Sequence, residues 1–143
     1  MEEHTLGQKR AAHALDVINK LAERKEYGKF GSYVQRLPAT IVMNGLGQAM
    51  AGELAAARLA KGDKMSADER AHKTLFDCVE RWLFKSEVYA KKEGLMVAIV
   101  SSNQEDYVRA QAEALAYLGW LKKFSQAYLD GGKDDSADIQ NRD

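Results

Sequence analysis

Apolar side chains recur along this chain at the spacing of amphipathic helices. Over residues 4–24 they follow an i, i+3, i+4, i+7 pattern, which places them on one face of a helix opposite a basic face. The same spacing returns over residues 66–87 and again over residues 102–128. Each of these two stretches opens with a capping-box sequence, because Ser66 and Ser102 are each followed three residues later by glutamate. These patterns predict three long helices.

The stretch between residues 33 and 61 is interrupted by Pro38 and by the dipeptide Asn44-Gly45. Proline suits the first position of a helix, so residues 33–37 are expected to form a short helix and Pro38 to open the next. The dipeptide Asn44-Gly45 is also typical of a β-hairpin turn. The residues after it lack β-branching and alternation, so we favour one helix from Pro38 to Lys61, ended by Gly62.

Residues 95–100 are six consecutive apolar side chains, which fit either a buried strand or a short buried helix. No other stretch supplies a partner strand, so we interpret this run as a helix. With one proline and abundant alanine, the whole pattern predicts an all-α fold, a single compact bundle of about five to seven helices over residues 1–130. Residues 131–143 are acidic and almost lack apolar side chains, so a disordered tail is expected there.

Charge and composition limit the number of domains, the cellular compartment and the partners to be expected. The chain has 143 residues, the size of one domain, and 21 basic side chains balance 21 acidic ones. The balance is uneven along the chain, since residues 1–65 carry a net charge of +3 and residues 103–143 a net charge of −3. The single cysteine excludes an internal disulfide, no signal peptide is visible, and the least polar stretch, residues 39–60, contains charged side chains. We therefore expect a cytoplasmic protein with no membrane partner.

No arrangement of residues typical of catalysis or metal binding stands out. The histidines His4, His13 and His72 are not at the spacing of metal ligands relative to one another. A di-iron bundle requires two Glu-x-x-His pairs, and the sequence holds one, Glu69-x-x-His72. Cys78 lies on an apolar helix face, where an inert buried thiol is expected. The sequence thus predicts no catalytic residue, no metal site and no cofactor.

Basic residues are concentrated near the N-terminus. Residues 9–36 hold seven of them against three acidic side chains, a net charge of +4. Lysine and arginine in such number can neutralise the phosphates of a nucleic acid, and Tyr27, Phe30 and Tyr33 between them could stack on bases. A charged face that meets only solvent is the commoner explanation of such residues, and the aromatic side chains are equally explained as core anchors.

Three segments together are distinctive: residues 8–15 (QKRAAHAL), residues 33–51 (YVQRLPATIVMNGLGQAMA) and residues 107–124, where YVR is followed by EALAYLGWLKKF. They resemble one known family, the small subunit of the type III-B CRISPR effector, the Cmr (RAMP-module) complex. The resemblance runs from about residue 5 to residue 130. It implies a small helical bundle without enzymatic activity, several copies of which stack as a minor filament along the RAMP subunits that carry the crRNA.

The resemblance also implies that this subunit helps to hold target RNA through basic side chains, while other subunits cut the RNA. Its partners would be other Cmr subunits, neighbouring copies of itself, and the duplex of crRNA with target RNA. Together with the basic pattern, it gives the expected RNA-binding residues: Lys9, Arg10, Lys20, Arg24, Lys25, Arg36, Lys122 and Lys123. The alternative is a helical scaffold that contacts other proteins and no RNA.

Overall fold

The computed structural model describes residues 3–90 and 93–129, and within these ranges the chain is helical and has no β-strand. The elements are α1 (Leu6–Arg24), α2 (Phe30–Asn44), α3 (Leu46–Ala57), the 3₁₀ helix η1 (Leu59–Lys64), α4 (Ala67–Lys85), α5 (Leu95–Ser101) and α6 (Gln104–Tyr128). The expected all-α fold is confirmed. The expected tail, residues 131–143, lies outside the described residues, and the single domain over residues 1–130 stays a prediction.

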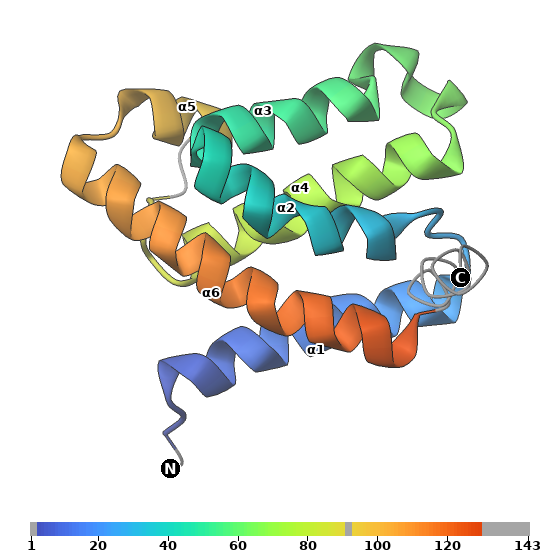
Figure 1. Cartoon of the computed structure of the whole chain (residues 1–143), viewed down its shortest axis with the longest axis horizontal. Coiled ribbons are helices and arrows are strands. Elements are labelled where there is room, and N and C mark those ends of the chain that lie inside the picture. Colours follow the sequence, from blue (N-terminus) through green and yellow to red (C-terminus); the bar gives the residue numbers. More distant parts are fainter. Residues whose placement is uncertain (1–2, 91–92, 130–143) are drawn as a thin grey trace, which may run out of the picture.

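Helix α2 lies at the centre of the arrangement, where it contacts α3, α4 and α6 (Figure 1). Helix α1 runs beside α6, and α5 contacts α3. The contact of α1 with α6 is the largest between any two helices, whereas the contact of α1 with α4 is small. The position of α1 relative to α4 is therefore set mainly through α6.

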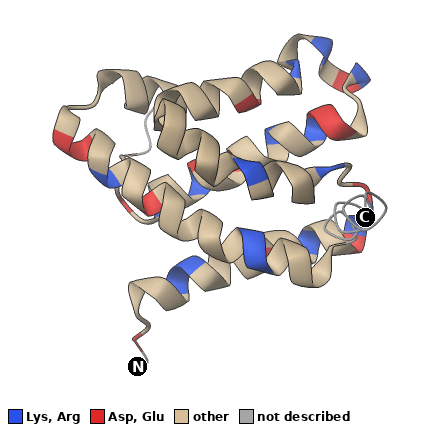
Figure 2. Cartoon of the chain, in the orientation of Figure 1, with Lys and Arg blue, Asp and Glu red and all other residues tan. Residues whose placement is uncertain are grey.

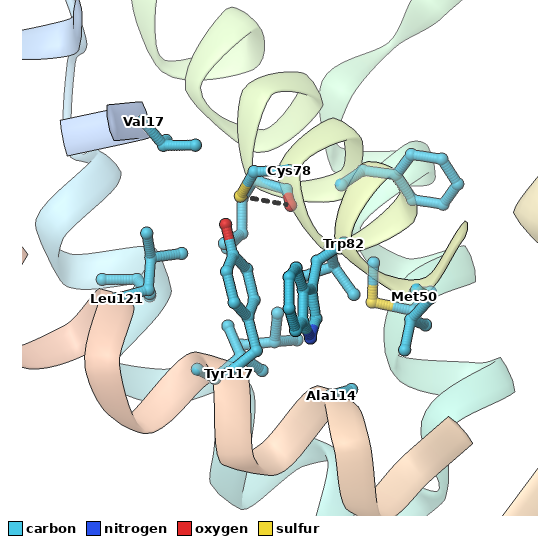
Figure 3. Packing of buried hydrophobic residues seen from close by; sticks show 14 of the residues in the cluster. Val17, Met50, Cys78, Trp82, Ala114, Tyr117 and Leu121 are labelled. Atoms are coloured by element: carbon cyan, nitrogen blue, oxygen red, sulfur yellow. Dashed lines mark hydrogen bonds between the residues drawn. The ribbon is translucent and has the colours of Figure 1, made fainter. Parts of the chain in front are cut away.

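One cluster of buried side chains joins all six α-helices. Its largest members include Trp82 of α4, Tyr117 of α6 and Phe30 of α2, each at most 2% exposed. The rings of Trp82 and Tyr117 stack with their centroids 5.6 Å apart, between the two helices that carry them (Figure 3). Burying a side chain of this size stabilises a fold by roughly 1.5–3 kcal/mol. The apolar stripes seen in the sequence are thus the surfaces along which the helices pack.

Pro38 lies inside α2 and does not open a helix, so this expectation was wrong. A proline inside a helix costs about 3 kcal/mol, because it removes a backbone hydrogen bond and crowds the preceding turn. Helix α2 offsets this cost by burying large side chains before and after the proline, namely Phe30, Val34, Leu37 and Ile41. The helix continues because packing outweighs the local preference.

The single helix expected over residues 38–61 was also wrong, because the chain breaks at Gly45 between α2 and α3. Gly45 has φ +89° and ψ 157°, a conformation that is almost restricted to glycine. Two amides at the start of α3 donate to side chains of α6: Leu46 N–H to Gln111 Oε1, and Gly47 N–H to Tyr107 Oη, both at 2.9 Å. These contacts from a distant helix fix where α3 begins.

The capping box expected at Ser66 is present at the start of α4, whereas the capping residue of α6 is one position later than expected. Helix α4 begins with the expected capping box, in which the side chains of Ser66 and Glu69 each accept from the other's backbone N–H. At α6 the capping residue is Asn103, which accepts from the N–H of Asp106, so the capping box expected from Ser102 was wrong by one residue. Asparagine serves as well as serine at this position, which explains the shift.

The apolar run of residues 95–100 forms α5, which confirms the helical interpretation. The first N–H of this helix, on Leu95, donates to Glu80 Oε2 of α4 at 2.9 Å. The end of α3 differs from the expectation, since α3 stops at Ala57 and Arg58 then adopts a left-handed conformation. Gly62 consequently lies within η1 and does not end a long helix.

Replacing Gly45 by alanine should destabilise the fold. Its φ is in the left-handed region, and an added Cβ would lie 3.0 Å from Tyr107 Oη. We expect the free energy of unfolding, measured by urea denaturation, to fall by about 1–3 kcal/mol. The control is Gly52→Ala in α3, where an added Cβ meets nothing within 4 Å and alanine should stabilise the helix by up to about 1 kcal/mol. Equal effects of the two substitutions would contradict the role given to Gly45.

Candidate nucleic-acid interface

A groove lies between α1 and α4. It consists of two hollows of about 680 and 630 Å³. Both hollows are lined by His13, Asp16 and Lys85, so they adjoin at these residues, and we call the two together the α1–α4 groove. Val17 and Trp82 supply apolar parts of its lining.

Basic side chains outnumber acidic ones along the α1–α4 groove, and Figure 2 shows lysine and arginine positions on both helices. The exposed basic residues that line it are Lys9, Lys20, Arg24, Arg81 and Lys85. The acidic residues that line it are Asp16, Glu23 and Glu87. Asp16 pairs with Lys20 at 3.0 Å, but both side chains are exposed, and such a pair holds its partners only weakly. The groove therefore carries a net positive charge.

The helical period brings these residues to one side of each helix. On α1 the lining residues include positions 9, 13, 16, 20 and 24, which recur every three or four residues. On α4 positions 74, 81 and 85 share a face in the same way. Each set borders the buried stripe of its own helix, so the packing that forms the core also turns both sets toward one groove.

Glu113 of α6 ties α1 and α4 together next to the groove. Its carboxylate accepts two hydrogen bonds from Arg10 of α1, Nε to Oε2 at 2.5 Å and Nη2 to Oε1 at 2.9 Å. It accepts a third from Trp82 Nε1 of α4 at 2.9 Å. Glu113 is only 8% exposed, and the hydrogen-bonded Arg10 guanidinium lowers the pKa of this carboxyl. Nothing in the sequence pattern had singled out Glu113.

His13 of α1 lies where the two hollows meet. Its Nδ1 is 2.7 Å from Tyr117 Oη of α6, and its ring centroid is 5.5 Å from that of Trp82. Burial, together with the positive charges of Lys85 and Arg81, lowers the pKa of His13 to about 4. The imidazole is therefore neutral at neutral pH.

The structure divides the predicted RNA-binding residues into two groups. Lys9, Lys20 and Arg24 line the α1–α4 groove. The others lie elsewhere: Arg10 in its pair with Glu113, Lys25 directly after α1, Arg36 on α2, and Lys122 and Lys123 on α6. Whether any of the eight contacts RNA stays a prediction.

Arg36 takes part in a separate aromatic group. Its guanidinium carbon lies 5.3 Å from the centroid of the Tyr33 ring. Tyr33 in turn stacks on His72 with the centroids 3.7 Å apart, and His72 Nδ1 lies 2.9 Å from Glu53 Oε1. Arg36 is thus held near α4, away from the α1–α4 groove.

Two groove residues, Arg81 and Lys85, were missed by the sequence reasoning. They belong to α4, more than 40 positions beyond the basic segment of residues 9–36. The available signal was their spacing of four residues along the edge of the apolar stripe of α4 that holds Cys78 and Trp82. That signal becomes informative only once α4 is known to face α1.

Cys78 is fully buried, and burial raises the pKa of its thiol to about 12, as expected for an inert cysteine. Across residues 3–90 and 93–129, no three His, Cys, Asp or Glu side chains are close enough together to hold a metal ion. In the same described ranges, no helix combines the length and the apolar character needed to span a membrane.

A helical bundle with a basic groove is the class of protein that these observations define, and two comparisons make it specific. The sequence matches the family model of CRISPR-associated protein (Cas_Cmr5) over residues 6–128, that is, from α1 to the end of α6. The chain therefore belongs to the Cas_Cmr5 family and is a small subunit of the Cmr complex, as its resemblance implied.

The fold is similar to that of a CRISPR-associated Cmr5 family protein from Thermus thermophilus. The crystal structure of that protein matches with a TM-score of 0.67 and 24% sequence identity, covering 89% of this chain and 99% of that chain. At this level of identity the likeness shows the fold, and it agrees with the all-α arrangement described above.

Substituting Glu113 by glutamine should cost far more stability than breaking an exposed ion pair. The amide cannot balance the Arg10 guanidinium, and it offers one acceptor oxygen where the carboxylate offers two. We expect the free energy of unfolding, measured by chemical denaturation, to fall by about 3 kcal/mol. The control is Arg109→Gln, which breaks an exposed pair with Asp106 at 3.6 Å and should change stability by less than about 1 kcal/mol. Similar losses in the two variants would show that the Glu113 contacts do not hold α1.

Proposed function

We propose that this chain is a non-catalytic Cmr subunit that helps to hold target RNA along its α1–α4 groove. The observation that carries the proposal is the groove itself, with five exposed basic side chains supplied by two helices. Lysine and arginine side chains bind RNA phosphates without regard to base sequence. Binding of that kind suits a subunit that holds RNA paired with crRNA and leaves cleavage to other subunits.

Several groove side chains are available for phosphate. Within the described residues, Arg24, Arg81 and Lys85 form no ion pair. Lys20 is paired with Asp16, but both side chains are exposed to solvent, so the pair is weak and Lys20 can leave it for a phosphate. Arg10 differs from these residues, because leaving Glu113 would strand a buried carboxylate. We therefore assign RNA contact to the groove residues and a structural role to Arg10.

The proposal includes assembly with other copies and with the crRNA-bearing backbone subunits. Apolar side chains are exposed at the C-terminal end of α2 and on α5: Val42 is 69% exposed, Met43 81% and Val100 77%. Exposed apolar side chains of this kind are typical of surfaces that meet another protein. Head-to-tail contacts between copies would extend a minor filament and bring successive grooves along one RNA. The buried lone cysteine accords with a cytoplasmic setting.

The same apolar side chains favour a second candidate function, a scaffold that contacts only proteins. In that case the basic side chains of the groove would be solvated and would have no nucleic-acid ligand. The two functions differ in one measurable respect, which is whether neutralising the groove weakens RNA binding.

The test neutralises three groove charges together, in the variant Arg24→Gln, Arg81→Gln, Lys85→Gln. Affinity of the isolated protein for single-stranded oligouridine should fall at least about tenfold at low salt. The slope of log affinity against log salt should also become shallower by about 2, since each phosphate contact on a single strand contributes about 0.7. Fluorescence anisotropy over a range of salt concentrations measures both, and capture of target RNA by the assembled complex should weaken too.

The matched control makes the same charge change at exposed positions outside the groove, in the variant Lys29→Gln, Lys64→Gln, Arg109→Gln. It should keep nearly the wild-type affinity and salt slope. Equal losses in both variants would mean that net charge, and not the groove, governs binding. A groove variant that assembles and captures RNA as the wild type does would support the scaffold function instead.

A further inference from the structure

His13 occupies a central place in the α1–α4 groove. It lines both hollows, a position that it shares only with Asp16 and Lys85 among the described residues. A phosphate chain that follows the groove from one hollow to the other must pass this point. The imidazole is partly buried there, against the rings of Trp82 and Tyr117.

Charged and titratable groups surround His13 from three helices. They are Asp16 and Lys20 on α1, Arg81 and Lys85 on α4, and the hydroxyl of Tyr117 on α6. Three of the four charged groups are positive. Burial, together with these positive charges, lowers the pKa of His13 to about 4 in the free protein. Burial also raises the pKa of Tyr117, so its hydroxyl stays neutral.

A polyanion in the groove reverses this balance. Phosphates beside Arg81 and Lys85 offset the charges that disfavour an imidazolium, and they add a negative potential that favours it. Both ring nitrogens of an imidazolium are donors, so one can donate to Tyr117 Oη while the other donates to a phosphate oxygen. A neutral ring can accept from the Tyr117 O–H at Nδ1 and donate its other N–H to a phosphate oxygen, but it brings no positive charge to that contact. Protonation makes the hydrogen bond to phosphate charge-assisted and therefore stronger.

We propose that His13 is a phosphate-binding residue of the α1–α4 groove, which contacts the RNA backbone as an imidazolium and takes up one proton from solvent when RNA binds. This inference rests on the proposed RNA-holding function. It adds a proton-linked ligand to the five permanently charged side chains, and it requires no covalent or redox step.

RNA affinity should therefore rise as the pH falls. If bound RNA returns the pKa of His13 from about 4 to its ordinary value near 6.5, affinity should be about tenfold higher at pH 5.5 than at pH 7.5. Oligouridine is the probe, because neither its bases nor its phosphodiesters titrate in this range. Titration calorimetry at pH 6.0 in two buffers of different ionisation enthalpy should show uptake of about three-quarters of a proton per protein.

Two histidine variants test the assignment. His13→Asn should abolish both the pH dependence and the proton uptake. His72→Gln should retain both, because His72 lies outside the groove and contacts Glu53 and Tyr33. If His13→Asn keeps the wild-type pH dependence, the inference is wrong.

A second measurement needs no variant and covers the case in which His13→Asn does not fold. The imidazole signals of the wild-type protein, followed by NMR through a pH titration, should show the pKa of the partly buried His13 rising when oligouridine is added. An unchanged titration in the presence of bound RNA would overturn the role of His13 while leaving the RNA-holding function intact. Absence of RNA binding at every pH would instead contradict the proposed RNA-holding function.

Discussion

A single carboxylate, that of Glu113, joins the three helices on which the groove depends. It accepts two hydrogen bonds from Arg10 of α1 and one from Trp82 of α4, while its own helix, α6, forms the largest contact with α1. Removing a carboxylate from water is costly, and this cost is recovered only when its oxygens are well paired. Both oxygens of Glu113 are paired, with Arg10 of α1 and Trp82 of α4. These contacts therefore specify one placement of α1 beside α4. The groove has its shape because this placement is fixed.

The same arrangement gives a chain with no net charge a basic groove, because basic side chains of α1 and α4 outnumber acidic ones there. The proposed binding of RNA depends on the potential along this groove and not on the net charge of the chain. The exposed apolar side chains Val42, Met43 and Val100 lie on α2 and α5, on elements that do not line the groove. The proposed RNA contact and the proposed protein contact thus use different parts of the surface.

Much of the fold follows from local signals in the sequence. The apolar stripes of α1, α4 and α6 and the capping box at Ser66 are local features, and the structure retains them. The expectations were wrong where contacts between residues far apart in the sequence determine the helix boundaries. Burial on both sides of Pro38 keeps α2 continuous, and Gln111 and Tyr107 of α6 fix the break at Gly45.

The site was harder to predict for the same reason. The groove pairs α1 with α4, so a search along one segment found Lys9, Lys20 and Arg24 but missed Arg81 and Lys85. Arg10 was grouped with them because the sequence does not reveal its partner, which lies 103 residues away.

The proposed position of RNA is the groove between α1 and α4. Amide chemical-shift mapping of the isolated protein during titration with oligouridine locates bound RNA on the surface. The largest shifts should fall in residues 9–24 and 74–87, with little change in η1 or α5. Largest shifts in η1, in α5 or along the exposed end of α2, with residues 9–24 and 74–87 unchanged, would contradict it.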